Sequence, residues 1–456
     1  MCFLTYYPMN TTLKSMLIAA AALTAVSSFA QDKATLDLLV KKGLITAEER
    51  AKTLDESSQA RAASGVGRVF PKEDATKRFT IGGYFQSQYE SFSSSINNKA
   101  TIYPTQSGFI MRRLYLELTA DIGEGLSGNV VMDMSGNTNS RSKNGSESWL
   151  DRAILTLNNE HGTFDLGLRK VAWGYEESTL SSLFKASSSK LYTVERGITN
   201  RYWNEAVKEG RLGFGAHHAG LFYTSVPNPQ GFEFGAAVTN ANRDLAAAGS
   251  GLNDLGLYAN VVWNNKISDN EKYAVGVNYG RVKFNDVSSD VTIQKLSTNE
   301  GYNPFVQAQY FNWTVYAEYM NTKLNDTKDG AARDHKPTGY NATIAYKIND
   351  NWEGVARYTT LDTDGRGITI GAGERDYSTT NGTGNYYNKS DAYYLGVNYY
   401  FPLTVVGNSY AGYNAKIQLG YEIAKFKGSL TAINGTLDNT QNAQVDAIRL
   451  QAQVAF

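Results

Sequence analysis

The chain has 456 residues, with 44 Lys and Arg against 44 Asp and Glu, so its formal charge is balanced. A balanced charge does not indicate a nucleic-acid-binding protein or a polyanion sink. The mean hydropathy is −0.39, and past residue 30 no apolar run approaches the roughly 18 residues that a membrane helix needs. Transmembrane β-barrels escape this last test, because only alternate residues of their strands face lipid.

Residues 1–30 have the features of a secretory signal peptide. Lys14 supplies the positive start, an apolar stretch follows, and the small residue Ala30 ends the segment. Residues 1–8 add nothing to this signal, so we interpret them as an artefact of an upstream start. The single cysteine, Cys2, lies there, and the predicted mature chain therefore has no disulfide and no thiolate metal site.

Residues 31–78 are the one stretch with helical periodicity. Leu39 belongs to a first apolar face, Gly43 breaks the helix, and Thr46 to Glu49 have the pattern of a capped restart. This pattern predicts a short helical hairpin and spacer on the periplasmic side. Three roles stay open for it: a solvated spacer, a trimeric helix association, or an attachment to the cell wall.

From residue 79 onward the apolar residues recur at every second position. In the first segment Ile81 and Phe85 share one face, and Gln86 and Glu90 share the other. A tilted strand needs roughly 9–11 residues to cross a bilayer. Sixteen segments of about this length follow one another, at 79–92, 109–122, 125–135, 148–158, 162–170, 211–225, 231–240, 252–264, 272–284, 301–312, 313–324, 339–349, 352–362, 391–401, 415–426 and 445–456.

The connections between these segments alternate in length. Long connections fall at 93–107, 136–147, 171–210, 241–251, 285–300, 325–338, 363–390 and 427–444, and short ones lie between them. A barrel with tight periplasmic turns and long outer loops has this rhythm. Aromatic residues near the segment ends fit two interfacial girdles. The fold class is therefore all-β: residues 79–456 are predicted to form a 16-stranded antiparallel transmembrane β-barrel, preceded by the short helical periplasmic segment.

The last segment, 445–456, closes the predicted barrel. Ile448 and Leu450 lie on its apolar face, whereas Arg449 and Gln451 lie on its polar face. It must pair with the first segment, so that no strand edge is left in lipid. The final Phe456 is predicted to lie at the periplasmic rim and to act as a signal for the barrel assembly machinery.

The longest connection, 171–210, has about forty residues, and loops of this length without strands are usually functional. Its surroundings resemble the phosphate-selective porin O/P family. Residues 108–135 are similar to the family's double-Arg strand and hairpin, and 148–179 to the strands that lead into its constricting third loop. Lys170 falls at the Lys that opens this loop in relatives, and Glu195 and Arg196 match a Glu-Arg pair within it. The resemblance implies a trimeric, sixteen-stranded outer-membrane channel with 171–210 as the constricting loop.

The candidate pore and constriction residues are Arg113, Arg169, Lys170, Lys185, Lys190, Glu195, Arg196 and Arg201. Lys and Arg suit oxyanions, because they form charge-assisted hydrogen bonds with them. The loop nevertheless contains as many acidic as basic residues, and the predicted inward strand positions are also close to balance. The sequence thus predicts no ladder of positive charge. Arg112 falls on an apolar face, and either reaches an interface or marks a bulge that brings both Arg112 and Arg113 into the lumen.

No enzymatic chemistry is indicated. The neighbours His217 and His218 are predicted to point to opposite faces of a strand, which makes them a poor metal chelate. The acidic loops at 325–330 and 362–365 lack the last carboxylate of a calcium-binding loop, so solvated tips are favoured over cation sites. We expect no cofactor and no metal.

The favoured function is passive diffusion of small hydrophilic solutes or ions, with anions such as phosphate included, through a pore in the bacterial outer membrane. The expected partners are outer-membrane lipid and lipopolysaccharide, the barrel assembly machinery, the permeating solutes and two further copies of the chain, with no nucleic acid. The alternative is a surface barrel without transport, either an adhesin or a structural protein, whose loops plug the lumen. An outer-membrane hydrolase is a more distant alternative.

Overall fold

The computed structural model has two compact units, residues 1–77 and 78–456, which are treated separately below. The residues that the structure describes are 40–42, 46–47, 49–50, 79–96, 99–135, 150–181, 190–205, 211–240, 255–283, 295–328, 331–375, 386–401, 403–405, 408–410, 415–430 and 441–455. Among them, no helix is long and apolar enough to span a membrane.

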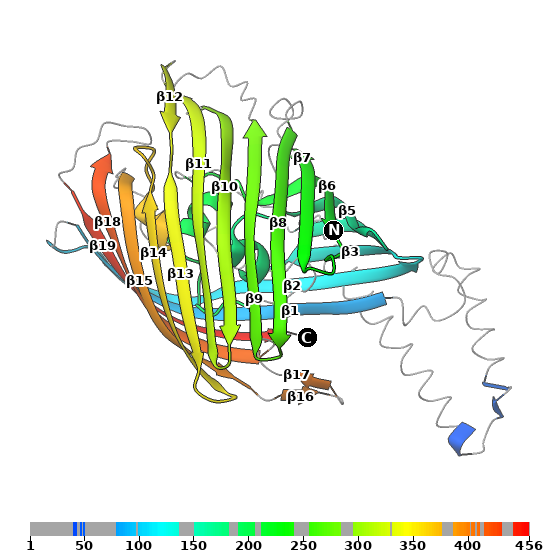
Figure 1. Ribbon diagram of the computed structural model, residues 1–456. Helices are drawn as coiled ribbons and strands as arrows, with labels where there is room; N and C mark the ends of the chain where they lie inside the picture. Colours follow the sequence, from blue (N-terminus) through cyan, green and yellow to red (C-terminus); the bar gives the residue numbers. More distant parts are fainter. Residues whose placement is uncertain are drawn as a thin grey trace, which may run out of the picture. The chain divides into compact units, whose positions relative to one another are not determined.

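The second unit is a sheet of long antiparallel strands (Figure 1). The strands of its first half are β1 (Phe79–Ile96), β2 (Lys99–Gly123), β3 (Leu126–Asp133), β4 (Leu150–Asn159), β5 (Gly162–Lys170), β6 (His217–Ser225), β7 (Phe232–Asn240), β8 (Leu255–Ser268) and β9 (Glu271–Lys283). Those of its second half are β10 (Lys295–Tyr310), β11 (Trp313–Lys328), β12 (Ala331–His335), β13 (Thr338–Lys347), β14 (Trp352–Asp362), β15 (Tyr386–Tyr400), β18 (Ala415–Leu430) and β19 (Ala443–Ala455).

The sheet closes into a barrel of sixteen strands. β12 and β13 pair with successive parts of the same neighbour, β11, so together they count as one strand. β19 then pairs with β1, from Tyr84 opposite Ala455 to Ile96 opposite Ala443, and no edge is left open. The predicted sixteen-stranded antiparallel barrel is confirmed, as is the pairing of the last strand with the first.

Alternation of side chains along β19 separates lipid from lumen. Ile448, Leu450 and Val454 are 42–47% exposed on the outer surface, whereas Arg449 and Gln451 are each 1% exposed on the inner one. Strand geometry imposes this contrast, because successive side chains point to opposite faces of a sheet. The polar face of the closing strand is therefore part of the barrel's inner wall, as its sequence predicts.

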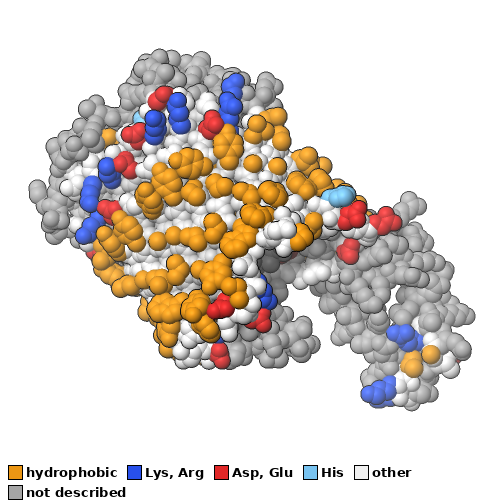
Figure 2. All heavy atoms as spheres, viewed as in Figure 1, with side chains coloured by type: hydrophobic (Ala, Val, Ile, Leu, Met, Phe, Trp, Pro, Cys, Tyr) orange, Lys and Arg blue, Asp and Glu red, His pale blue; other side chains and the backbone are white. Residues whose placement is uncertain are grey.

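Aromatic side chains mark two levels on the outer surface. On four strands they lie six residues apart: Trp313 and Tyr319 on β11, Tyr340 and Tyr346 on β13, Trp352 and Tyr358 on β14, and Tyr393 and Tyr399 on β15. Ring contacts link neighbouring strands at both levels, as in the Trp313–Tyr346 and Tyr358–Tyr393 pairs. Figure 2 shows the apolar side chains gathered over this face, with charged groups along its margins. Six residues span roughly 20 Å of strand, a spacing that suits the two girdles of a transmembrane barrel.

A β-bulge changes the orientation of side chains in β2. The register between β1 and β2 shifts at this point, with Gln86 opposite Arg113 but Ser87 opposite Met111. Arg112 is therefore the additional residue, and both Arg112 and Arg113 are at least nine-tenths buried. Of the two alternatives for Arg112, the bulge that turns both arginines inward is the one observed.

Some expected boundaries need correction. β6 begins at His217 and not at residue 211, because residues 211–216 still belong to the packed end of the preceding loop. Several strands extend farther on the side of the long connections; β12, for example, lies within the expected loop 325–338. The expected connection 402–414 contains a short separate hairpin, β16 (Leu403–Val405) and β17 (Asn408–Tyr410).

In the first unit, the described residues include the expected capped restart. The backbone N–H of Thr46 donates to the Glu49 carboxylate (2.8 Å), and the backbone N–H of Glu49 donates to the Thr46 hydroxyl (3.1 Å). These reciprocal bonds form a capping box. The predicted signal peptide lies outside the described residues, as does most of the helical hairpin.

A matched pair of substitutions tests the assignment of lipid and lumen faces. Leu395 on β15 is 66% exposed on the outer surface, whereas Asn260 on β8 lines an internal cavity. Leu395→Arg is expected to lower the unfolding free energy in lipid vesicles by about 2–4 kcal/mol, because a charge near the bilayer midplane is poorly solvated. Asn260→Arg is expected to change it by less than about 1 kcal/mol. Equal losses in urea titrations would contradict this assignment.

Candidate functional site: a loop packed inside the barrel

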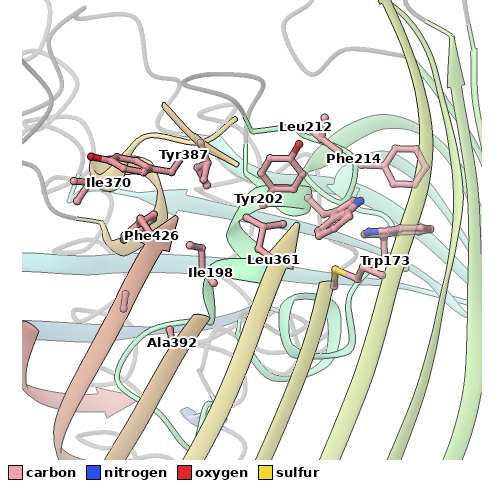
Figure 3. Packing of buried hydrophobic residues seen from close by; sticks show 14 of the residues in the cluster. Trp173, Ile198, Tyr202, Leu212, Phe214, Leu361, Ile370, Tyr387, Ala392 and Phe426 are labelled. Atoms are coloured by element: carbon pink, nitrogen blue, oxygen red, sulfur yellow. The ribbon is translucent and has the colours of Figure 1, made fainter. Parts of the chain in front are cut away.

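The connection between β5 and β6 packs inside the barrel. Its described parts contain the π-helix η1 (Glu176–Ser181) and the helix α4 (Ile198–Asn204). Trp173, Tyr202 and Trp203 are fully buried and belong to a continuous apolar cluster with residues of the barrel wall (Figure 3). The cluster includes residues of β8 and β9 as well as of β11 and β14, so the loop packs against more than one side of the barrel wall.

Two buried glutamates anchor the beginning of the loop to that wall. Glu318 on β11 accepts hydrogen bonds from the backbone N–H of Tyr175 (2.7 Å) and from the side chain of Asn200 in α4 (2.7 Å). Glu176 accepts one from the backbone N–H of Gly197 (2.9 Å), and thus joins η1 to the start of α4. Buried carboxylates require such donors, because an unpaired one is costly to desolvate.

Arg357 on β14 joins the loop to the wall through several contacts. Its guanidinium donates to Glu176 (3.2 Å), to the hydroxyl of Thr193 (2.9 Å), to the backbone carbonyl of Glu195 (2.5 Å) and to Glu422 on β18 (2.7 Å). The planar guanidinium has five N–H donors in fixed directions, which suits a site that must bind several oxygens at once.

The middle of the loop is held by polar side chains of β15 and β18. The Lys416 ammonium donates to the carbonyl of Leu191 (2.7 Å), and Asn398 donates to the carbonyl of Tyr192 (2.8 Å). Gln418 donates to both carbonyls at 3.1 Å. Backbone groups of a loop that is buried without strand partners are thereby satisfied.

Charged residues join the loop to other segments. Arg112 in the β2 bulge binds both oxygens of Glu195. Arg375, which follows the short helix α5 (Ile370–Glu374), lies 3.4 Å from Glu195 and 3.4 Å from Glu205. Residues more than 80 positions apart in the sequence thus share one carboxylate, and the loop is linked to β2 and to the connection after β14.

The same set of contacts continues to β5. Glu177 pairs with Lys170, the last residue of β5, and with Arg196. Arg196 also reaches Glu205 at 2.7 Å, and Glu205 pairs with Arg211. We call the whole set the ion network; its members are Arg112, Lys170, Glu177, Glu195, Arg196, Glu205, Arg211 and Arg375.

Among the residues that the structure describes, the ion network contains more bases than acids. Five bases share three carboxylates, and every carboxylate contacts at least two bases. Arg211 and Arg375 are its most exposed members, with side chains that are 12% and 16% exposed. Positive groups in a low-dielectric cleft raise the local concentration of anions.

The neighbouring bases hold two of the carboxylates in their ionised form. Burial by itself would raise the pKa of Glu177, but Arg196 and Lys170 outweigh burial and lower the pKa to about 2. Burial would likewise raise the pKa of Glu195, and Arg112 and Arg113 lower it to about 2. Both groups are therefore charged throughout the neutral and mildly acidic range.

A second cluster lies where α4 meets α5. Glu422 is tightly bound, with Arg357 at 2.7 Å and Arg449 at 2.9 Å. Glu374 is fully buried, but its carboxylate lies 3.9 Å from Arg201 and 3.8 Å from Arg449 and has no hydrogen-bond partner among the described residues. Burial, with a further contribution from Glu422, raises the pKa of Glu374 to about 8. At neutral pH its carboxyl group is consequently mostly protonated.

A cavity of about 370 Å³ lies between the start of the loop, at Ala172, and the wall of β2 to β8. Its lining comes from β2 to β8 and includes hydroxyl and amide side chains together with two paired bases. Arg152 lies 2.9 Å from Glu117, and Arg169 binds Asp165 while its guanidinium lies 4.7 Å from the Phe222 ring centre. A cavity of this size has room for water.

The structure brings three of the eight predicted pore residues together in the ion network. Lys170, Glu195 and Arg196 belong to the ion network. The other predicted residues lie elsewhere: Arg169 lines the cavity, Arg113 donates to Gln86 (2.7 Å), Arg201 lies in the Glu374 cluster, Lys190 is exposed, and Lys185 lies outside the described residues. The three residues in the ion network come from the end of β5 and from the loop.

Three charged residues of the site could not be predicted from the sequence. Arg211 and Arg375 were not predicted, although they complete the positive excess of the ion network. Glu374 lies in a connection with no pattern that indicates burial. Only the double-Arg pattern at Arg112 offered a signal, because an arginine on an apolar face requires an explanation such as a bulge.

The histidines give no sign of a metal or catalytic site. His217 lies 3.3 Å from Asp151, whereas His218 is buried with its Nδ1 3.2 Å from the carbonyl of Asn240. The two neighbours thus have separate partners. In the described part of the chain, no three His, Cys, Asp or Glu side chains gather in a way that suits a metal ion.

A closed sixteen-stranded barrel with a loop packed inside it and a polar cavity beside the loop defines a porin. The family described as phosphate-selective porin O and P matches residues 79–456. The chain belongs to this family, and it is a passive diffusion pore of the bacterial outer membrane.

Solved structures show the same fold. The anion-selective porin from Comamonas acidovorans is 15% identical, with a TM-score of 0.51 over 83% of this chain and 99% of that one. The outer membrane channel DcaP of Acinetobacter baumannii is 12% identical, with a TM-score of 0.50 over 83% of this chain and 97% of that one. A comparison with curated protein sequences gives no match.

The two buried carboxylates beside Arg449 are expected to respond differently to amide substitution. Glu422→Gln breaks two hydrogen-bonded ion pairs, and should lower the unfolding free energy at pH 7 by about 3–5 kcal/mol. Glu374→Gln replaces a mostly neutral group, and should change it by less than about 1 kcal/mol. Urea unfolding in detergent micelles measures both values. A larger loss for Glu374→Gln would show that this residue, and not Glu422, carries the buried charge.

The low pKa values of Glu177 and Glu195 predict how the pore responds to acid. Their folded pKa lies below the ordinary value, so the stabilisation is complete above about pH 5 and is lost as the pH falls towards 2. Single-channel conductance should stay constant from about pH 7 to pH 5 and change only below about pH 4. Glu177→Gln should reproduce at pH 7 the conductance seen in acid. A transition centred near pH 6–7 would contradict this assignment.

Proposed function

We propose that the loop 171–210 is the constriction of the pore and that the ion network gives the pore a preference for small anions. The observation that carries the proposal is the composition of the ion network, in which five bases share three carboxylates. Anions that approach the constriction are attracted by the excess positive charge, and cations are repelled.

The path of a solute follows from the position of the loop. The loop is bonded to the wall of β10 to β18, so solutes pass on the other side, along the cavity of β2 to β8. The ion network joins β2 and β5 to the loop, and its Lys170 directly follows Arg169, which lines this cavity. No energy source is required, because a wet path lets a solute keep most of its hydration.

The preference that we propose is for anions as a class, of which phosphate is one. Every base of the ion network already contacts a carboxylate, so an entering anion must compete for the same N–H donors. Weak attraction of this kind permits entry and also permits release. The structurally similar porin from Comamonas acidovorans is described as anion-selective, which agrees with the proposed preference for anions.

The alternative, a surface barrel whose loops plug the lumen, predicts a lumen without free space. The cavity beside the loop, whose lining includes hydroxyl and amide side chains, favours transport over this alternative. We propose no enzymatic activity, since the described site contains neither a nucleophile–base pair nor a metal-binding group. Absence of stepwise conductance in planar bilayers would favour the plugged barrel.

Processing and assembly remain proposals that rest on the sequence and the family. We propose cleavage of the signal peptide after residue 30, a periplasmic location of residues 31–78, and assembly into a homotrimer. Phe456, which lies outside the described residues, is proposed to be the signal for the assembly machinery. Sequencing of the mature N-terminus tests the cleavage, sedimentation in detergent tests the trimer, and outer-membrane levels of a chain without Phe456 test the signal.

Substitutions in the ion network test the selectivity. Arg211→Gln and Arg375→Gln together remove two of the five bases, and are expected to lower the ratio of chloride to potassium permeability by about twofold or more. The matched control is Lys266→Gln with Lys347→Gln, two bases that lie in ion pairs at the turns of the barrel. Reversal potentials in a salt gradient measure the ratio. Cation preference in the unmodified protein, or equal effects of both double variants, would contradict the proposed role.

A further inference from the structure

The cavity beside the loop has a polar side and a nonpolar side. One register row of its lining crosses five strands, from β4 to β8, and consists of Thr156, Asp165, Phe222, Ala237 and Tyr258. The polar members of this row lie on β4 and β5, and the nonpolar members lie on β6 to β8. Tyr258 counts as nonpolar here, because its hydroxyl already donates to a backbone carbonyl of the loop (3.0 Å).

The bases of the cavity are paired with its acids. Arg152 lies 2.9 Å from Glu117, and Arg169 binds Asp165. The lining contains one further acid, Glu233, and no further base. An entering anion therefore meets no base in this lining that lacks a carboxylate beside it. Such pairs instead present oxygen acceptors next to N–H donors, and a hydroxyl group can use both, because it donates one hydrogen bond and accepts others.

Three polar side chains of the lining remain available to a ligand. Ser127, Thr224 and Asn260 are partly exposed, and their side chains have no hydrogen-bond partner among the residues that the structure describes. Thr224 and Asn260 flank Gly235 in the register of β6, β7 and β8. A methyl group on Gly235 would lie 2.1 Å from the side-chain oxygen of Asn260, so this amide extends over the glycine towards Thr224.

The cavity and the ion network lie at different levels of the barrel. Along β2, Glu117 and Thr119 lie between Arg112 and the short turn to β3. Along β5, Asp165 lies between the short turn from β4 and Lys170. Short turns are at the periplasmic end of such barrels. A solute on the proposed path therefore meets the ion network and the cavity one after the other.

We propose that the cavity is a binding subsite for a neutral polyhydroxylated solute, namely a monosaccharide or a small polyol. The two ion pairs, Thr224 and Asn260 bind its hydroxyl groups, while Phe222 and Ala237 contact its C–H groups. Ligand pockets combine nonpolar surface with a few polar groups in this way, and the cavity of about 370 Å³ is near the lower end of their range of roughly 300–1,000 Å³. A single sugar ring suits this size.

Other classes of solute fit the lining less well. A nonpolar solute would leave the amide of Asn260 and the hydroxyl of Thr224 without partners and without water. A charged solute would have to separate one of the ion pairs, which leaves a charge without its partner. A polyol keeps both pairs intact and replaces only water. Its binding is weak for the same reason, and weak binding permits release into the periplasm.

Block of the ionic current by D-glucose in planar bilayers tests the subsite. In potassium chloride, glucose should lower the single-channel conductance of the full-length protein in a saturable way. Thr224→Val with Asn260→Leu should raise the concentration for half of this block at least about tenfold, because two hydrogen bonds to hydroxyl groups are lost. Polyethylene glycol of similar molecular size should lower the conductance only in proportion to its concentration.

The matched control is Gln307→Leu with Thr314→Val. It removes an amide and a hydroxyl from β10 and β11, outside the cavity lining, and should leave the glucose block unchanged. Circular dichroism and measurable conductance establish that both double variants are folded and open. A non-saturable effect of glucose that equals that of polyethylene glycol overturns the proposal. Equal half-block concentrations for the Thr224 and Asn260 variant and the unmodified protein overturn it too, as does an equal loss in the control.

The inference rests on the proposed path of solutes and not on the proposed preference for anions. Reversal potentials without sugar measure that preference separately. Saturable glucose block in a channel that prefers cations would contradict the proposed anion selectivity and support the subsite. An anion-selective channel without saturable block would do the reverse. Absence of conductance would overturn both.

Discussion

The contacts of Arg357 determine where the pore lies. Its guanidinium binds two buried glutamates, a threonine hydroxyl and a backbone carbonyl. Three of these four groups belong to the internal loop, and the fourth is Glu422 on β18. An unpaired guanidinium in this position would cost several kcal/mol, so the loop cannot leave the wall without a large loss. Lys416 and Gln418 extend the same attachment along the loop backbone. Together these hydrogen bonds fix the loop to β14 and β18.

The ion network holds the loop at a second place, towards β2 and β5. Its contacts differ in kind from the hydrogen bonds that join the loop to β14 and β18. The wall contacts satisfy the loop backbone with neutral and charged donors in nearly complete burial. The ion network instead consists of carboxylates that are shared between bases, several of which retain some exposure. Shared carboxylates hold the bases in place and reduce their charge without cancelling it. A pore wall built in this way attracts ions and does not trap them.

The barrel could be predicted from the sequence because short stretches of sequence contain the patterns that specify its strands. The period of two, the alternating lengths of connections and the aromatic residues near strand ends all follow from bilayer geometry. The site is different, because its contacts join residues that are far apart in the sequence. Arg375 and Glu195 are 180 positions apart, and no short pattern pairs them. Counting charges within 171–210 alone gave balance, whereas further bases come from β2, β5, the last part of the β5–β6 connection and the connection after β14.

The bulge at Arg112 shows how a small local change has a large effect on the site. Without the additional residue, strict alternation would place Arg112 among lipid-facing side chains, where it would be costly. With it, Arg112 reaches Glu195. The same alternation governs β18, whose inner face carries Glu422 and whose outer face carries Tyr421 and Lys425. One strand thus contributes to the attachment of the loop and to the lipid surface at once, and a register slip of one residue would destroy both.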